Sequence, residues 1–297
     1  MATDVFLQHL VNGIALGSLY ALVAIGYTMV YGILRMINFA HGDIFMMAAY
    51  FAFFGIVTFR IPWYLSFVLV ILCTAGLGIV IERFAYRPLR DAPKNSVLIS
   101  AIGASFLLEN LATFAFSGKP KAFPRIPFFS ENLSFGVVKF QAISLFTPVV
   151  TIILMIVLLY VVNHTKLGMA MRAVSKDYEM AKVMGIDIDR IISYTFGIGS
   201  ALAAIGAMMW GIKYPQVAPM MGVMPGLKCF IAAVIGGIGN IKGAVIGGFL
   251  LGLGEIMLVA FLPTLTGYRD AFAFVVLIFI LLFRPTGILG EKVTEKV

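Results

Sequence analysis

Long apolar runs separated by short polar stretches follow one another along the whole of this 297-residue chain. Most runs are close to the roughly 20 residues that a helix needs to cross about 30 Å of hydrocarbon. They are unbroken, whereas the strands of a membrane barrel alternate polar and apolar residues over about ten positions. The pattern therefore predicts membrane-spanning helices over residues 5–30, 42–59, 62–82, 96–117, 142–163, 191–211, 241–262 and 269–283.

A further apolar piece, residues 227–238, is too short for a comfortable crossing. We expect a tilted short helix, a broken half-helix or a re-entrant segment there. The predicted fold class is an all-α polytopic membrane protein with a bundle of eight to ten transmembrane helices. No linker or low-complexity tract divides the chain, so residues 1–297 are expected to form a single membrane domain.

A short internal similarity suggests inverted repeats within this bundle. Residues 17–26 resemble residues 199–206 after a two-residue gap. The two spans run in opposite directions in the predicted topology, as an inverted repeat requires. The match is short and apolar, so a chance similarity is the alternative.

Composition agrees with a membrane protein, because 61% of the residues are apolar, 12% are charged and the mean hydropathy is +1.01. If residues 227–238 cross the membrane, fourteen of the 22 Lys and Arg residues fall on one side and eight on the other. The positive-inside rule then places the amino terminus outside and the carboxyl terminus in the cytoplasm. Basic loops beside anionic lipid account for the net charge of +8, so we expect no nucleic-acid partner.

A polar heptapeptide, residues 37–43, stands between two of the apolar runs and contains Asn38, His41 and Asp43. Polar groups in hydrocarbon cost several kcal/mol unless they are satisfied, so they usually face protein, water or a transport pathway. These three residues could form a polar binding site for a zwitterion along a transport pathway. The alternative, which we favour, is that they stabilise a helix break through hydrogen bonds.

A second interruption lies at residues 236–240, where Gly237, Gly239 and Asn240 break a helix near the membrane. Transporters place such breaks beside their cavities, so we expect this segment to border the pathway. Other glycines are spaced four apart, as at Gly13 and Gly17, and predict close helix packing.

The longest predicted cytoplasmic loop, residues 164–190, carries mixed charges and predicts a helix outside the membrane. Ser175 or Asp177 could cap it, and Gly185 could end it in a left-handed conformation. Such a helix suits docking into a groove on a cytosolic partner. A solvated connector is the alternative.

The chain displays no constellation of nucleophile, base and orienting group, so we expect a transport protein rather than an enzyme. His9, His41 and His164 are scattered, which predicts no metal site, and no feature calls for a cofactor. There is no G-x-x-x-x-G-K-[ST] loop for ATP. Carboxylates within spans, such as Glu109 and Glu255, could carry protons, which would make the chain an ion-coupled secondary transporter.

Several segments, taken together and in order, resemble the LivH-type inner-membrane permeases of ATP-binding-cassette importers for branched-chain amino acids. The segments that carry the resemblance are residues 17–22, 24–32, 36–43, 81–83, 86–90, 98–103, 184–186, 232–244 and 284–290. The resemblance runs nearly end to end and implies transport of leucine, isoleucine and valine across the bacterial inner membrane. A permease for urea or other short amides is the alternative within the same family.

The resemblance also implies partners: a second, related permease subunit in a heterodimer, two cytosolic ATPase subunits and a periplasmic amino acid binding protein. Glu179, Ala181 and Gly185 resemble the E-A-A-x-x-x-G coupling signature of importer permeases, which favours the docking-helix interpretation. Arg172 and Asp177 lie in the same segment and are assigned to ATPase coupling with them. The chain departs from the signature in having a methionine as the middle residue and in lacking the downstream Leu-Pro.

Overall fold

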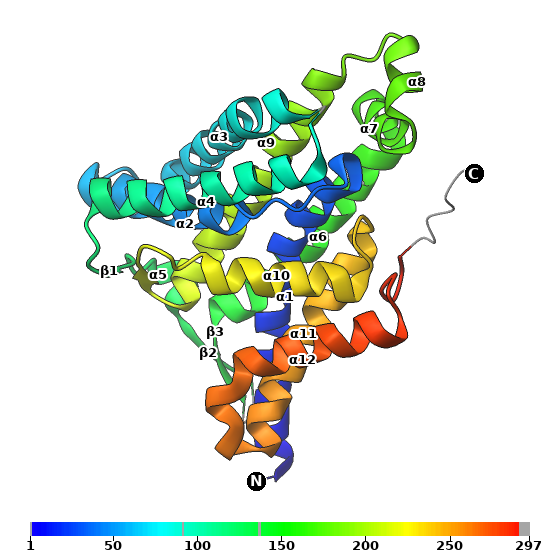
Figure 1. Ribbon diagram of the computed structural model, residues 1–297. Helices are drawn as coiled ribbons and strands as arrows, with labels where there is room; N and C mark the ends of the chain where they lie inside the picture. Colours follow the sequence, from blue (N-terminus) through cyan, green and yellow to red (C-terminus); the bar gives the residue numbers. More distant parts are fainter. Residues whose placement is uncertain (1, 91, 136–137, 291–297) are drawn as a thin grey trace.

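The computed structural model describes residues 2–90, 92–135 and 138–290, and it is dominated by helices (Figure 1). Two of the fourteen basic residues that the topology prediction assigns to the cytoplasmic side, Lys292 and Lys296, lie outside the described residues. The long helices are α1 (Ala2–Leu34), α2 (His41–Phe53), α3 (Trp63–Ile81), α4 (Lys94–Phe116), α6 (Ala142–His164), α9 (Ile188–Lys213), α11 (Ile241–Phe261) and α12 (Arg269–Phe283).

Short turns of other helix types lengthen three of these helices. A π-helical segment, Phe54–Thr58, continues α2, and π-helical and 3-10 segments continue α3 through Leu89. A 3-10 segment, Pro263–Tyr268, precedes α12. With these extensions, eight helices in the described part of the chain are long and apolar enough to cross a membrane, which confirms the eight predicted spans.

The short apolar helix of the sequence is also present, as α10 (Val223–Gly236). It begins four residues earlier than predicted, and its first turn contains Pro225 and Gly226. Proline is compatible with the first turn of a helix, where a backbone N–H has no intrahelical partner.

Helix α1 forms the centre of the bundle and is surrounded by α6, α9, α10 and α11 (Figure 1). In its most apolar stretch 94% of the residues are buried, against 6% in the stretch that ends with α12. The faces of α1 and α11 approach closely, since a Cβ atom on Gly17 would lie 2.8 Å from the Cα atom of Phe249. The predicted close packing at the spaced glycines is confirmed here.

The two segments that resemble one another, in α1 and α9, pack against each other in opposite directions. Gly26 contacts Gly199, and the ring of Tyr20 lies 6.1 Å from that of Trp210, so the residue numbers rise along one helix as they fall along the other. Each of these long helices is followed by a loop and then by a shorter helix, α2 or α10. This order is the one expected of an inverted repeat.

The remaining elements lie at the two ends of the bundle. Helices α7 (Lys166–Lys176) and α8 (Tyr178–Val183) lie at one end, far from the amino terminus in Figure 1. At the other end are α5 (Pro127–Ser130) and four short strands, β1 (Lys121–Ala122), β2 (Asn132–Phe135), β3 (Val138–Gln141) and β4 (Gln216–Val217). Strands β1 and β4 pair antiparallel, as do β2 and β3, with Leu133 opposite Phe140.

Candidate functional site

The shorter helices α2 and α10 meet at their amino-terminal ends. A Cβ atom on Gly42 would lie 2.5 Å from the carbonyl oxygen of Gly222, and one on Gly226 would lie 2.9 Å from the Cα atom of Gly42. Only glycine allows two backbones to approach this closely. The crossing therefore brings two helix amino termini, each with a partial positive charge, to one place.

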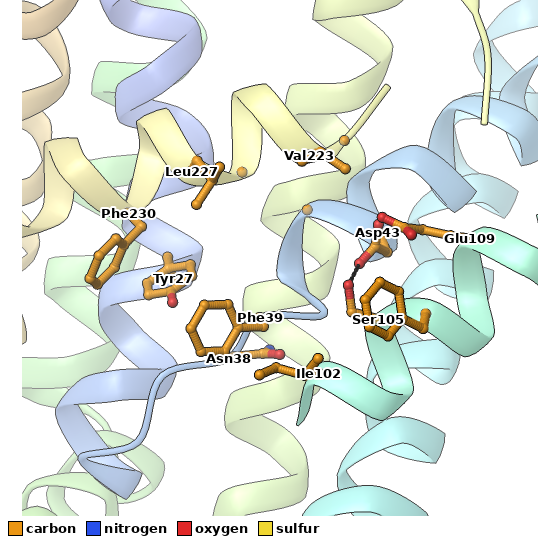
Figure 2. A pocket seen from close by; sticks show the side chains of 14 residues that line it. Tyr27, Asn38, Phe39, Asp43, Ile102, Ser105, Glu109, Val223, Leu227 and Phe230 are labelled. Carbon is orange, nitrogen blue, oxygen red and sulfur yellow. Dashed lines mark hydrogen bonds between the residues drawn. The ribbon is translucent and has the colours of Figure 1, made fainter. Parts of the chain in front are cut away.

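A cavity of about 210 Å³, which we call the inner cavity, opens beside this crossing (Figure 2). It is walled by α1, α2, α4 and α10, and most of its lining is apolar. The residues that line it are Tyr27, Asn38, Phe39, Gly42, Asp43, Ile102, Ser105, Phe106, Glu109, Gly222, Val223, Gly226, Leu227 and Phe230. In Figure 2 the carboxylates of Asp43 and Glu109 lie at one end, and the rings of Tyr27 and Phe230 lie at the other.

Asn38 and Asp43, two buried polar residues of the heptapeptide, line the inner cavity and can each form a further hydrogen bond. Asn38 accepts a hydrogen bond from the hydroxyl of Tyr86 at 2.9 Å, and Asp43 accepts one from Ser105 at 2.5 Å. The Nδ2 atom of Asn38 and the Oδ1 atom of Asp43 have no hydrogen-bond partner among the described residues. A buried unpaired polar atom costs about 1–3 kcal/mol, so both atoms favour a polar ligand or water.

His41, the third polar residue of the heptapeptide, does not line the inner cavity. Its Nε2 atom lies 3.3 Å from the carbonyl oxygen of Val23, and its ring packs edge-on against Tyr27 at 5.5 Å. It is 1% exposed. This geometry fits a side chain that joins α1 to the start of α2.

The second predicted pathway segment lies elsewhere, in the turn between α10 and α11. Gly237 and Gly239 have positive φ angles of 107° and 94°, and Gly239 packs against Gly32 near the end of α1. Asn240 caps α11 by accepting a hydrogen bond from Gly243, and it donates one to the carbonyl of Leu289. The structure does not bring these residues together with Asn38 and Asp43, and their part in a pathway stays a prediction.

The segment assigned to ATPase coupling forms two short helices rather than the one predicted. Asp177 breaks the helix with φ −152° and ψ 108°, and its carboxylate accepts a hydrogen bond from the backbone of Met180 at the start of α8. Asp177 therefore confirms one of the two predicted caps, while it also ends α7. Gly185 has φ +78°, which confirms the predicted left-handed end.

Helix α8 presents an apolar face to solvent. Val183 is 79% exposed, Met184 75% and Met180 58%, whereas Ala181 is buried against the rest of the protein. Glu179 is exposed on the same helix. Arg172, on α7, donates a hydrogen bond to the carbonyl of Val162 at the end of α6, and so holds α7 to a membrane helix.

A charged network connects α8 to the bundle through Arg90. Its guanidinium donates to Glu82 and to Asp189, each at 2.5 Å, and to the hydroxyl of Tyr178 at 3.3 Å. Glu82 is fully buried and also accepts a hydrogen bond from Ser193 at 2.6 Å. The first residue of α8 is thereby tied to α3 and α9.

Most groups of the inner cavity were not singled out from the sequence as pathway residues, among them Ser105, Phe230 and the two glycines, Gly222 and Gly226, that meet Gly42. Nothing local distinguishes them, because each gains its place only from contact with a distant segment. Glu109 carried a signal, since a carboxylate within a predicted span demands a partner or a polar surrounding.

Comparison with known proteins identifies similar chains. Residues 9–281 match the family described as "Branched-chain amino acid transport system / permease component". The chain is 44% identical to the high-affinity branched-chain amino acid transport system permease protein BraD of Pseudomonas aeruginosa, over 98% of both chains. It is 42% identical to LivH of Escherichia coli K12, again over 98% of both chains. A probable branched-chain amino acid transport permease protein LivH of Methanocaldococcus jannaschii is 28% identical over 94% of this chain and 91% of its own.

Proposed function

The chain belongs to the family of branched-chain amino acid transport permeases, and from this premise we propose that it carries leucine, isoleucine and valine across the inner membrane. It is a multi-pass membrane permease subunit of the ATP-binding-cassette importer type. As a permease it is not itself an enzyme. Residues 1–297 act as one transmembrane permease domain, with the amino terminus outside and the carboxyl terminus in the cytoplasm.

The observation that carries the substrate assignment is the inner cavity. Its apolar walls suit an aliphatic side chain, and the free Oδ1 atom of Asp43 suits an ammonium group. The two helix amino termini and the Nδ2 atom of Asn38 suit a carboxylate. Together these groups match each part of a branched-chain amino acid zwitterion. We assign Asn38 and Asp43 to substrate contact, with His41 as their support and with Gly237, Gly239 and Asn240 at the cytoplasmic exit.

The proposed complex contains a second, related permease, two cytosolic ATPase subunits and a periplasmic amino acid binding protein. The sequence has no ATP-binding loop, so ATP is hydrolysed by another polypeptide. Helix α8 is the docking element, and its exposed Val183, Met184 and Met180 enter a groove on an ATPase subunit. Closure of the ATPase pair moves residues 172–187. This movement switches the helix bundle between an outward-open and an inward-open conformation.

Reconstitution tests the proposal directly. The permease pair, ATPases and binding protein are placed in proteoliposomes, and ATP hydrolysis is measured with leucine, with urea and without ligand. We expect stimulation by leucine-loaded binding protein alone. Stimulation by urea would assign the chain to a short-amide permease. Leucine uptake driven by an ion gradient without any ATPase would identify an ion-coupled carrier and overturn the proposal.

Replacement of Asp43 by asparagine is expected to lower leucine uptake about tenfold or more. Hydrogen bonds to charged groups contribute about 1.5–3 kcal/mol, and the ammonium group loses its charged partner. Asparagine keeps the volume and can still accept from Ser105, so the complex should assemble. Uptake is measured in proteoliposomes, with Glu131→Gln in an exposed loop as the control. Unchanged uptake in the Asp43 variant would leave the heptapeptide with a purely structural role.

Replacement of Val183 by aspartate is expected to weaken ATPase binding at least tenfold while the permease still inserts and folds. The side chain is 79% exposed, so its charge costs nothing in the free permease but is buried in the complex. Glu179→Gln and Gly185→Ala should act in the same direction. Pull-down of the ATPase and ligand-stimulated hydrolysis report the effect.

Lys242→Asp is the control for these variants. It adds a carboxylate to another exposed cytoplasmic site, and this variant should bind the ATPase normally. Normal binding and stimulation in the α8 variants would remove the coupling assignment.

A further inference from the structure

Four charged side chains cluster in the membrane bundle at the end opposite α7 and α8. Lys228 of α10 lies 2.9 Å from Glu255 of α11 and 2.8 Å from Asp270 of α12. Arg269 lies 3.5 Å from Glu255, and the hydroxyl of Tyr20 donates to the same carboxylate at 3.2 Å. Glu255 is fully buried and Lys228 is 8% exposed. None of these residues lines the inner cavity.

A gain in folding stability does not by itself explain why four charged side chains lie together inside the bundle. Buried ion pairs usually gain less from attraction than they lose in desolvation, and apolar residues of similar volume often stabilise as well or better. Ionisable residues inside a membrane bundle therefore indicate a functional site by default. The Nε atom of Arg269 is buried and has no hydrogen-bond partner among the described residues, so the network is also incompletely satisfied.

A cavity of about 380 Å³, which we call the outer cavity, is formed around this cluster. Charged groups line it from α10 and α12, and the aromatic rings of Tyr20, Trp210 and Tyr214 line it from α1 and α9. The rings of Trp210 and Tyr214 lie 4.9 Å apart, and the Lys228 Nζ atom lies 5.7 Å from the centre of the Tyr20 ring. The side chain of Asp270 is 50% exposed, so a ligand can reach it.

Helices α1 and α10 line both the inner and the outer cavity, and α10 presents a different face to each. Met224, Pro225 and Lys228 face the outer cavity, whereas Val223, Leu227 and Phe230 face the inner one. The inner cavity is mostly apolar, while the outer cavity carries both signs of charge and aromatic rings. The inner cavity therefore offers contacts for the aliphatic side chain of an amino acid as well as for its charged groups, whereas the outer cavity offers contacts mainly for the charged groups.

We propose that the outer cavity binds the ammonium and carboxylate groups of an α-amino acid, as a station before the inner cavity; this rests on the proposed function. The ligand carboxylate takes the place of Asp270 beside Lys228 and Arg269. The freed Asp270 carboxylate and the face of Trp210 receive the ammonium group. Because these contacts involve only groups common to all amino acids, leucine, isoleucine and valine bind alike.

Protection of an introduced cysteine tests the proposal. Thr266 lines the outer cavity and is exposed, so Thr266→Cys is made in a chain whose Cys73 and Cys229 are replaced by alanine. The reconstituted importer, without nucleotide, is labelled with a membrane-impermeant maleimide. Leucine and valine should slow labelling. The oxo acid of leucine, which lacks the ammonium group, and 3-methylbutylamine, which lacks the carboxylate, should not.

Asp270→Asn is expected to raise the leucine concentration for half-protection about tenfold or more, because a charged hydrogen-bond partner is lost. Glu131→Gln, which removes an exposed carboxylate at the same end of the protein, should leave it unchanged. In an importer that takes up leucine, absence of protection by leucine would overturn the inference. So would protection by either analogue equal to that by leucine, or protection by leucine that is insensitive to Asp270→Asn. Absence of leucine uptake in the parent importer would instead refute the proposed function.

Discussion

Replacement of Arg90 by methionine is expected to lower the free energy of unfolding by about 3–5 kcal/mol, the usual cost of removing one partner from a buried ion pair. Glu82 is fully buried, and the Arg90 side chain that neutralises it is only 9% exposed. Without Arg90, Glu82 keeps the hydrogen bond from Ser193 as its remaining polar contact in the described network. Thermal and denaturant unfolding of the purified protein in detergent measure the loss.

Arg87 provides a matched control, because it is also an arginine and also pairs with Asp189. Its side chain is 39% exposed and that of Asp189 is 41% exposed. Exposed pairs contribute about 0–1 kcal/mol, so Arg87→Met should have a small effect. Equal losses of unfolding free energy in the Arg87 and Arg90 variants would contradict the conclusion that the Arg90–Glu82 pair is buried and the Arg87–Asp189 pair is exposed.

The double variant Arg90→Met with Glu82→Gln separates stability from coupling. Neutralising Glu82 removes the unpaired buried charge, so we expect most of the stability to return. The bond from Arg90 to Tyr178 at the start of α8 stays broken. Ligand-stimulated ATP hydrolysis should therefore remain low in a folded protein. Recovery of both properties would show that the network serves folding alone.

Replacement of Gly42 by alanine should abolish uptake and destabilise the protein by about 1–3 kcal/mol or more, as overpacking does in close-packed interiors. The new Cβ atom would lie 2.5 Å from the carbonyl oxygen of Gly222 and 3.3 Å from the Cα atom of Gly226. Both are backbone atoms, so no side-chain rotation relieves the clash. Leucine uptake and thermal unfolding are the measurements.

Gly76→Ala is the control for the Gly42 variant. Gly76 lies within α3, and an added Cβ atom there would meet nothing within 4 Å. Alanine is favoured over glycine in a helix interior by about 1 kcal/mol, so this variant should be at least as stable as the parent. Similar losses at both positions would mean that the crossing has no special role.

The membrane helices and their ends were predictable, because apolar length and capping are local properties. The eight spans follow from runs of apolar residues, and the cap at Asp177 and the left-handed Gly185 follow from residue type and position. The break between α7 and α8 was missed, since the same Asp177 that starts one helix also ends the other.

The cavities were harder to predict, because contacts between distant segments form them. Asn38 and Asp43 stood out as polar residues between apolar runs, but Gly222 became significant only when the fold brought it against Gly42. In the topology prediction Lys228 was one of the eight basic residues on the side opposite the cytoplasm. Its place in a short apolar segment, together with Glu255 within a predicted span, was the available signal for the charged cluster.

The backbone contact at Gly42 has a pharmacological consequence. Helix α10 shares this contact with α2 and presents a different face to each cavity, so a tilt about the contact that widens one cavity narrows the other. A small apolar compound bound in the inner cavity would then keep that cavity wide and the outer cavity narrow. Substrate could not bind in the narrowed outer cavity. Inhibition of this kind would be competitive with the amino acid although the two bind in different cavities, because occupancy of either cavity disfavours occupancy of the other.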